Sequence, residues 1–134
     1  MTTGSRKKPG AFSLTRIDVR SENETRDVDQ LGAAILEELA GAPGFISSVL
    51  TTVGRRGHTV TAWEDAEAPK QLLTRGAHKE AMTRFFGSDL AAGGMTSVWV
   101  PARINATWIR CEACGQMVNH DLLEAFRGWS RTAL

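Results

Sequence analysis

The chain has 134 residues, enough for one domain with a hydrophobic core and too few for two domains of ordinary size. Its 42% apolar and 23% charged residues are typical of a soluble globular protein. The 16 Lys and Arg nearly balance the 15 Asp and Glu, which argues against a nucleic-acid partner. No apolar run is long enough to span a membrane and no secretory signal opens the sequence, so we expect a cytoplasmic protein.

The N-terminal third predicts a tail, a strand and a helix. Residues 1–10 are polar and basic, with Gly and Pro, and predict a flexible tail. Residues 11–20 alternate between apolar and polar side chains, which indicates a strand. Ser21 and Glu24 have the spacing of a capping box, and the apolar stripe that follows predicts a helix over about 26–40.

The middle of the chain predicts a hairpin, two helical segments and a long strand. Residues 45–53 and 58–63 are rich in β-branched side chains and flank the Gly-bounded turn 54–57, so they predict a β-hairpin. Helical spacing recurs between 65 and 86. Residues 95–110 form a long extended stretch that predicts the last strand.

The predicted order is β-α-β-β-α-β, the ferredoxin-like α+β arrangement with both helices on one face of a four-stranded antiparallel sheet. We expect this domain to span 11–110, with 111–134 forming a Cys-x-x-Cys knuckle and a short helix. Because little chain remains to cover the other face of the sheet, we expect a second protomer to cover it.

Three segments carry a family resemblance. They are Pro43-Gly44-Phe45, Val60-Thr61-Ala62-Trp63-Glu64-Asp65-Ala66-Glu67-Ala68 and His78-Lys79-Glu80-Ala81-Met82. Over residues 12–100 the chain resembles the antibiotic-biosynthesis-monooxygenase family of dimeric α+β barrels. The resemblance implies a homodimer whose protomers each enclose a ligand cavity between sheet and helices. The family includes cofactor-free oxygenases of aromatic compounds and members without known activity.

The chain departs from the haem-degrading branch of that family at three positions. Met82 stands where that branch has its axial histidine, Leu72 where it has a helix tryptophan, and Thr15 where it has a strand asparagine. We therefore expect no haem, and no flavin either.

A cofactor-free oxygenase needs a base and groups that stabilise an oxyanion. His78 is the candidate base, and Arg103 or Asn105, on the predicted last strand, are the candidate oxyanion donors. Two alternatives stay open: His78 caps its helix or packs at a rim, and Arg103 pairs with an acidic side chain.

The candidate ligand-binding residues are Trp63, Met82, Phe85 and Trp99, which we expect to line a flat aromatic pocket beside the helix that carries His78. The alternative is that the two tryptophans are core residues, since a chain without tyrosine fills its interior with other large side chains.

Cys111 and Cys114 have the spacing of a metal-binding pair, and Gly115 permits the tight turn of a zinc knuckle. His120 is the candidate third ligand, with the fourth left open among Asp121, His58, a partner residue and water. A labile thiol or disulfide pair and two inert cysteines are the alternatives.

Two functional hypotheses follow. The first is a small oxygenase that acts on an aromatic, secondary-metabolite-type ligand. The second is a non-catalytic dimeric ligand-binding or accessory protein with a structural zinc knuckle. A third combines them, with the cysteines and His120 forming a catalytic metal centre that keeps an open position.

Overall fold

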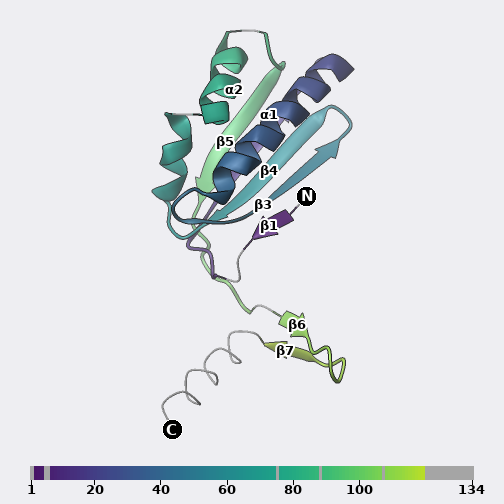
Figure 1. Cartoon of the computed structure of the whole chain (residues 1–134), viewed down its shortest axis with the longest axis vertical. Helices are drawn as coiled ribbons and strands as arrows, with labels where there is room; N and C mark the ends of the chain where they lie inside the picture. The colour runs from purple at the N-terminus through teal and green to yellow at the C-terminus, as the bar shows by residue number, and fades with distance from the viewer. Residues whose placement is uncertain (1, 5–6, 75, 88, 107, 120–134) are drawn as a thin grey trace. The chain divides into compact units, whose positions relative to one another are not determined.

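The computed structural model describes residues 2–4, 7–74, 76–87, 89–106 and 108–119 of the chain (Figure 1). The chain divides into two compact units, Met1–Pro101 and Ala102–Leu134, which we describe separately. The sequence had placed the end of the main domain at residue 110, whereas the first unit ends at Pro101.

The first unit contains six strands and helices of the predicted fold and two further short elements. Its elements are β1 (Thr2–Gly4), β2 (Ala11–Asp18), α1 (Glu22–Ala40), β3 (Phe45–Val53), β4 (Arg56–Trp63), the 3-10 helix η1 (Ala68–Leu73), α2 (Gly76–Phe86) and β5 (Gly93–Trp99). Strand β1 lies in the segment that the sequence predicted as a tail, and it pairs with β3.

The five strands of this unit form one antiparallel sheet in the order β1-β3-β4-β2-β5. Strands β2 to β5 with α1 and α2 have the ferredoxin-like β-α-β-β-α-β topology, so the predicted fold class is confirmed. The hairpin turn is shorter than expected, because Val53 already pairs with Arg56 and Gly54 takes a φ of +59° in the turn.

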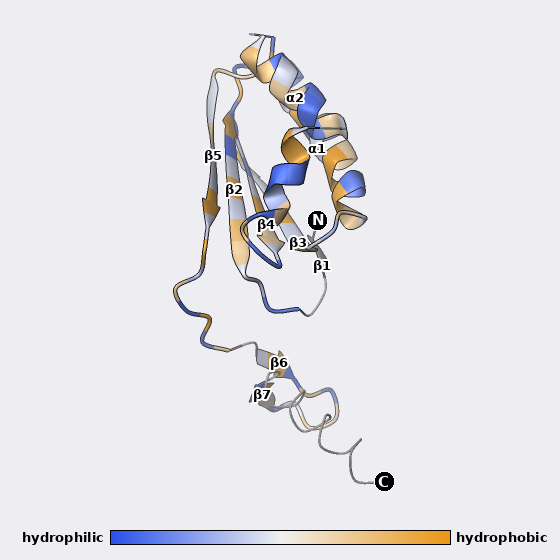
Figure 2. Ribbon diagram, turned by 90° about the vertical axis from the view of Figure 1, so that its left-hand side faces the viewer, coloured by the Kyte–Doolittle hydropathy of each residue, from blue (hydrophilic) through white to orange (hydrophobic). Residues whose placement is uncertain are grey.

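Both helices lie on one face of the sheet (Figure 2). A Cβ added at Gly32 of α1 would lie 3.4 Å from Leu50 of β3, and one at Gly94 of β5 would lie 3.3 Å from the Phe85 ring of α2. A Cβ at Gly94 would also lie 2.6 Å from the backbone oxygen of Arg16, so glycine is required there, whereas the distance at Gly32 is an ordinary packing contact. The largest fully buried apolar side chains in the described chain are Trp63, Leu39 and Leu90.

The other face of the sheet bears no helix of the first unit (Figure 2). The strand register gives it apolar residues at one end and the polar pairs Arg16–His58 and Asp18–Arg56 at the other. Leu14 pairs with Val60, and Val60 with Val49, so the three side chains form a row across the sheet. Val60 is 40% exposed, and Trp99 of β5 is 60% exposed. We refer to this side as the uncovered face.

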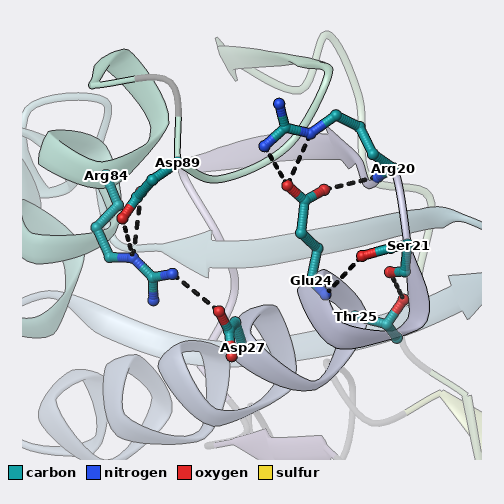
Figure 3. Close-up of polar contacts among 7 residues, drawn as sticks. All are labelled: Arg20, Ser21, Glu24, Thr25, Asp27, Arg84 and Asp89. Atoms are coloured by element: carbon teal, nitrogen blue, oxygen red, sulfur yellow. Dashed lines mark hydrogen bonds and ion pairs between the residues drawn. The ribbon is translucent and has the colours of Figure 1, made fainter.

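The first helix begins four residues earlier than its apolar stripe predicted. Ser21 caps it, because its Oγ accepts a hydrogen bond from Glu24 N–H at 3.2 Å. Glu24 Oε2 accepts from the backbone N–H of Arg20 at 2.7 Å, and its carboxylate also pairs with the Arg20 guanidinium (Figure 3). Ser21 and Glu24 thus accept hydrogen bonds from backbone N–H groups at the start of the helix.

An ion-pair network connects the two helices. Arg84 of α2 lies 2.8 Å from Asp27 Oδ2 of α1 and 3.3 Å from Asp89 Oδ2 in the following loop (Figure 3). The two carboxylates raise the pKa of Arg84 above its ordinary value. Arg84 therefore stays charged and holds α2 against α1.

The described part of the second unit contains one small antiparallel hairpin, formed by β6 (Trp108–Arg110) and β7 (Met117–Asn119). The predicted long strand over 95–110 is wrong, because residues 100–106 between β5 and β6 are in neither strand nor helix. Pro101, which lacks a backbone N–H, stands where β5 has ended. The predicted C-terminal helix falls outside the described residues.

Within the described residues, no helix is both long enough and apolar enough to cross a membrane.

Candidate functional site

A pocket of about 340 Å³ lies between the sheet and the segment that contains η1 and α2. The sequence predicted a cavity in this place, beside the helix that carries His78. The volume lies at the lower end of the range typical of small-molecule sites. The lining residues are Ser13, Thr15, Pro69, Lys70, Leu72, Leu73, His78, Met82, Thr96, Ser97 and Val98.

The sheet side of the pocket is a row of hydroxyl groups. Ser13 and Thr15 alternate with Phe12 and Leu14 along β2. The side chains of Ser13 and Thr15 therefore point toward the helices, and those of Phe12 and Leu14 lie on the uncovered face. Thr96 of β5 pairs directly with Thr15. Sequence reasoning missed these hydroxyls as site residues, although the alternation of Ser13 and Thr15 with apolar neighbours was the signal that could have identified them.

The helix side of the pocket is mainly apolar and includes one imidazole. Leu72 and Met82 contribute apolar surface, and Lys70 at the edge pairs with Glu67. This wall suits a flat apolar ligand, while the hydroxyl row opposite suits polar substituents on that ligand.

His78 is half-buried in the pocket wall, and its Nδ1 is buried without a hydrogen-bond partner among the described residues. Burial lowers the pKa of His78, and this outweighs a backbone hydrogen bond with Leu72 and the charge of Glu38, which both raise it. The folded-state pKa therefore lies below the ordinary value of about 6.5, and the imidazole is neutral at pH 7. A neutral imidazole can accept a proton.

The start of α2 is held by a carboxylate from α1. Glu38 accepts hydrogen bonds from Ala77 N–H at 2.9 Å and 3.1 Å through its two oxygens. Gly76 has a φ of +68°, and a Cβ there would lie 2.0 Å from Glu38 Oε2. The contact fixes the helix turn from which His78 projects.

Gly76→Ala is therefore expected to destabilise the protein by about 2–3 kcal/mol. About 1–2 kcal/mol comes from the left-handed backbone and about 1 kcal/mol from loss of the Glu38 cap. Gly41→Ala is the matched control, because Gly41 has a φ of −100° and no atom within 4 Å of an added Cβ. Urea denaturation checks both variants, and equal midpoints would contradict the assigned role of Gly76.

Trp63 does not line the pocket, contrary to the sequence-based prediction. Its side chain is fully buried, its Nε1–H donates to Ser13 Oγ at 3.0 Å, and its ring meets Phe45 edge-on at 5.9 Å. The alternative of a core tryptophan is therefore the observed one. Trp63 still affects the pocket indirectly, because it orients the hydroxyl of Ser13.

Phe85 and Trp99 are also absent from the pocket lining. The Phe85 ring packs over Gly94, and Trp99 pairs with Phe12 on the uncovered face, where its Nε1–H donates to Ser97 Oγ at 2.7 Å. Of the predicted pocket residues, His78 and Met82 lie in the wall. Ligand contact by either residue stays a prediction.

Arg103 and Asn105 do not lie on the last strand of the sheet. Both are exposed residues in the irregular segment that opens the second unit. The placement that motivated their oxyanion role was therefore wrong, and the polar side chains that line the pocket are the hydroxyl row, His78 and Lys70.

Cys111 and Cys114 are free thiols in the turn of the second unit's hairpin. Hydrogen bonds from the backbone and side chain of Cys114, and from the backbone of Ala113, lower the pKa of Cys111. His120, the predicted third metal ligand, lies outside the described residues. Within the described residues, no group of three His, Cys, Asp or Glu side chains is placed to hold a metal ion, so zinc binding stays a prediction.

The structure is a ferredoxin-like α+β domain with a pocket between sheet and helices, and solved structures with the same fold match it. An uncharacterized ferredoxin-fold protein from Listeria monocytogenes, related to antibiotic biosynthesis monooxygenases, aligns with a TM-score of 0.63 at 15% identity, over 78% of this chain and 63% of its own. SnoaB, a cofactor-independent oxygenase from Streptomyces nogalater, aligns with a TM-score of 0.58 at 14% identity, over 71% of this chain and 95% of its own.

A third structure was determined with a ligand. It is the monooxygenase from the ActVA-Orf6 gene of Streptomyces coelicolor, in complex with nanaomycin D, with a TM-score of 0.56 at 15% identity, over 74% of this chain and 93% of its own. No protein-family model and no curated protein matches the sequence. At these identities the likeness shows a shared fold, and the chain spans about 63% of the length of the Listeria protein.

Proposed function

We propose that the first unit binds a small aromatic molecule with phenol or enol groups in the pocket and oxidises it with dioxygen. The observation that carries this proposal is the half-buried His78, with its unpaired Nδ1, in an apolar wall opposite the hydroxyls of Ser13, Thr15 and Thr96. The shared fold with two oxygenases supports it at the level of architecture.

The reaction class follows from this set of groups. His78 takes a proton from the ring carbon or hydroxyl of the substrate, and the hydroxyl row donates hydrogen bonds to the resulting oxyanion. The electron-rich anion then reduces dioxygen. For an activated methylene the balance is one CH₂ and one O₂ giving one C=O and one H₂O, so all four electrons come from the substrate. The apolar wall limits water at the reacting carbon.

A binding protein without turnover is the second candidate. The observation that favours it is that, among the described residues, the pocket walls hold no arginine, and that Lys70, the one cation among the lining residues, is already paired with Glu67. The remaining donors are hydroxyl groups, which are weaker than a charged donor. This candidate predicts that ligand binds and that dioxygen is not consumed.

The second part of the proposal is a homodimer formed through the uncovered face. Val49 and Val60 of the row described above, and Trp99 on the same face, are exposed apolar side chains of the kind that interfaces bury. A two-fold axis would pair this face with itself, because a symmetric dimer uses the same patch on both protomers.

Oxygen uptake with a dihydroxyanthrone and a set of quinols tests the catalytic proposal. His78→Gln is expected to lower kcat/KM by about 10²–10⁴-fold, as loss of a general base does. His58→Gln is the matched control, because His58 pairs with Arg16 in the sheet and does not line the pocket. Binding without uptake in the native protein would favour the second candidate.

The pH profile is a separate prediction. Since the neutral imidazole is the active form and burial lowers its pKa, kcat/KM is expected to fall in the acid direction with a midpoint below the ordinary value of about 6.5. If kcat/KM already falls as the pH is lowered from 8 to 7, this result would contradict a lowered pKa of His78.

A further inference from the structure

The turn between β6 and β7 is closed by its own backbone. Beyond the last paired residues of the hairpin, Cys111 N–H donates to Gln116 O at 2.8 Å, and Gly115 N–H donates to Cys111 O at 2.8 Å. The guanidinium of Arg110 also donates to the carbonyl of Gly115. The loop that separates the two cysteines is thus fixed from both ends.

Gly115 gives the turn its direction. Its φ is +73°, in the left-handed region, and an added Cβ would meet no atom within 4 Å. Glycine is therefore favoured at this position by its backbone conformation, and not by a lack of space for a side chain. The turn brings the chain back immediately after the second cysteine.

Both cysteines stand in this closed turn and are separated by two residues, which is the spacing at which a zinc knuckle places two sulfurs on one metal. Cys111 is half-buried and Cys114 is exposed, so at least one of the two sulfurs is open to an incoming ion.

We propose that this turn is a metal-binding knuckle, in which Cys111 and Cys114 supply two thiolates to a zinc ion. Thiolate pairs favour soft or borderline cations over Mg²⁺ and Ca²⁺. A structural zinc takes four ligands. Cys111 and Cys114 supply half of that set, and within the described residues no third His, Cys, Asp or Glu side chain is placed beside them. The site is independent of the pocket in the first unit.

Cobalt(II) substitution of the full-length, reduced protein tests the proposal, because thiolate ligation gives an intense sulfur-to-cobalt charge-transfer band that zinc then removes. Cys111→Ser and Cys114→Ser are each expected to weaken binding at least about 100-fold. Glu112→Gln is the matched control, since Glu112 is an exposed residue of the same turn and no predicted ligand. Absence of the band in the native protein, or its survival in both cysteine variants, would overturn the proposal, and so would purification of the native pair as a metal-free disulfide.

Gly115→Ala provides a second readout that keeps both thiols. The left-handed conformation penalises alanine, so zinc affinity is expected to fall about five- to thirtyfold while the charge-transfer band remains at saturation. An unchanged affinity would mean that the metal does not use the turn seen here. The metal content, one zinc per chain or one per two chains, identifies whether a second copy completes the site.

Discussion

Trp63→Ala is expected to destabilise the first unit by about 3–5 kcal/mol, the cost typical of emptying a buried aromatic site. Trp63 is fully buried, contacts Phe45 edge-on and donates to Ser13 Oγ, so the substitution leaves a cavity and an unpaired hydroxyl. Because this loss is a large fraction of the roughly 5–15 kcal/mol that stabilises a domain, we expect a much lower Tm for the variant.

Trp99→Ala is the matched control for that result. Trp99 is 60% exposed and bonds to Ser97, so its loss is expected to cost the isolated protomer less than about 1 kcal/mol. Trp63→Phe keeps most of the ring and removes the bond to Ser13, and it should fall between the two. Chemical denaturation at low protein concentration compares the three, and equal losses for Trp63→Ala and Trp99→Ala would contradict the assignment of core and surface.

Val60→Glu is expected to weaken the proposed dimer at least about 100-fold. Val60 lies in the middle of the uncovered face, between Leu14 and Val49, and a dimer formed through this face would bury the new carboxylate without a partner. The protomer should keep its fold, because Val60 is 40% exposed in the single chain.

Phe86→Glu is the control for the dimer experiment. Phe86 is also an exposed apolar side chain, but it ends α2 in the helix layer. Sedimentation of the native protein and both variants at micromolar concentration measures the outcome. A native monomer, or a dimer that Val60→Glu leaves intact, would contradict an interface on the uncovered face.

The fold was predictable because its signals are local. The capping box at Ser21, the period-two alternation along β2 and the glycine turn between β3 and β4 each specify one element, and the order of elements specifies the topology. Strand β1 was missed because three residues of an edge strand carry no periodicity. The last strand was predicted too long because the extended pattern was continued past Pro101, whose missing N–H marks a bulge, a bend or an edge, and β5 ends at Trp99.

The place of the pocket was predictable, but only some of its lining residues were. His78 and Met82 follow from helix spacing, and both line the pocket. The aromatic residues were misplaced because their burial depends on which face of the sheet receives the helices. Phe12 and Trp99 pair across β2 and β5 on the uncovered face, whereas Trp63 turns inward beside Ala11. The hydroxyl residues form the pocket wall because of how the helices pack on the sheet, and this packing cannot be predicted from any single segment of the sequence.

The central claim is that the space between the sheet and α2 is the ligand site, and an NMR titration of the isotope-labelled protein with a dihydroxyanthrone tests it most directly. We predict saturable shifts at the amides of Ser13, Thr15, Thr96 and Met82, together with a shift of the His78 ring signals. The residues of the uncovered face, such as Val49, should not move. Shifts confined to that face, or no saturable shift for any pocket residue, would contradict the claim.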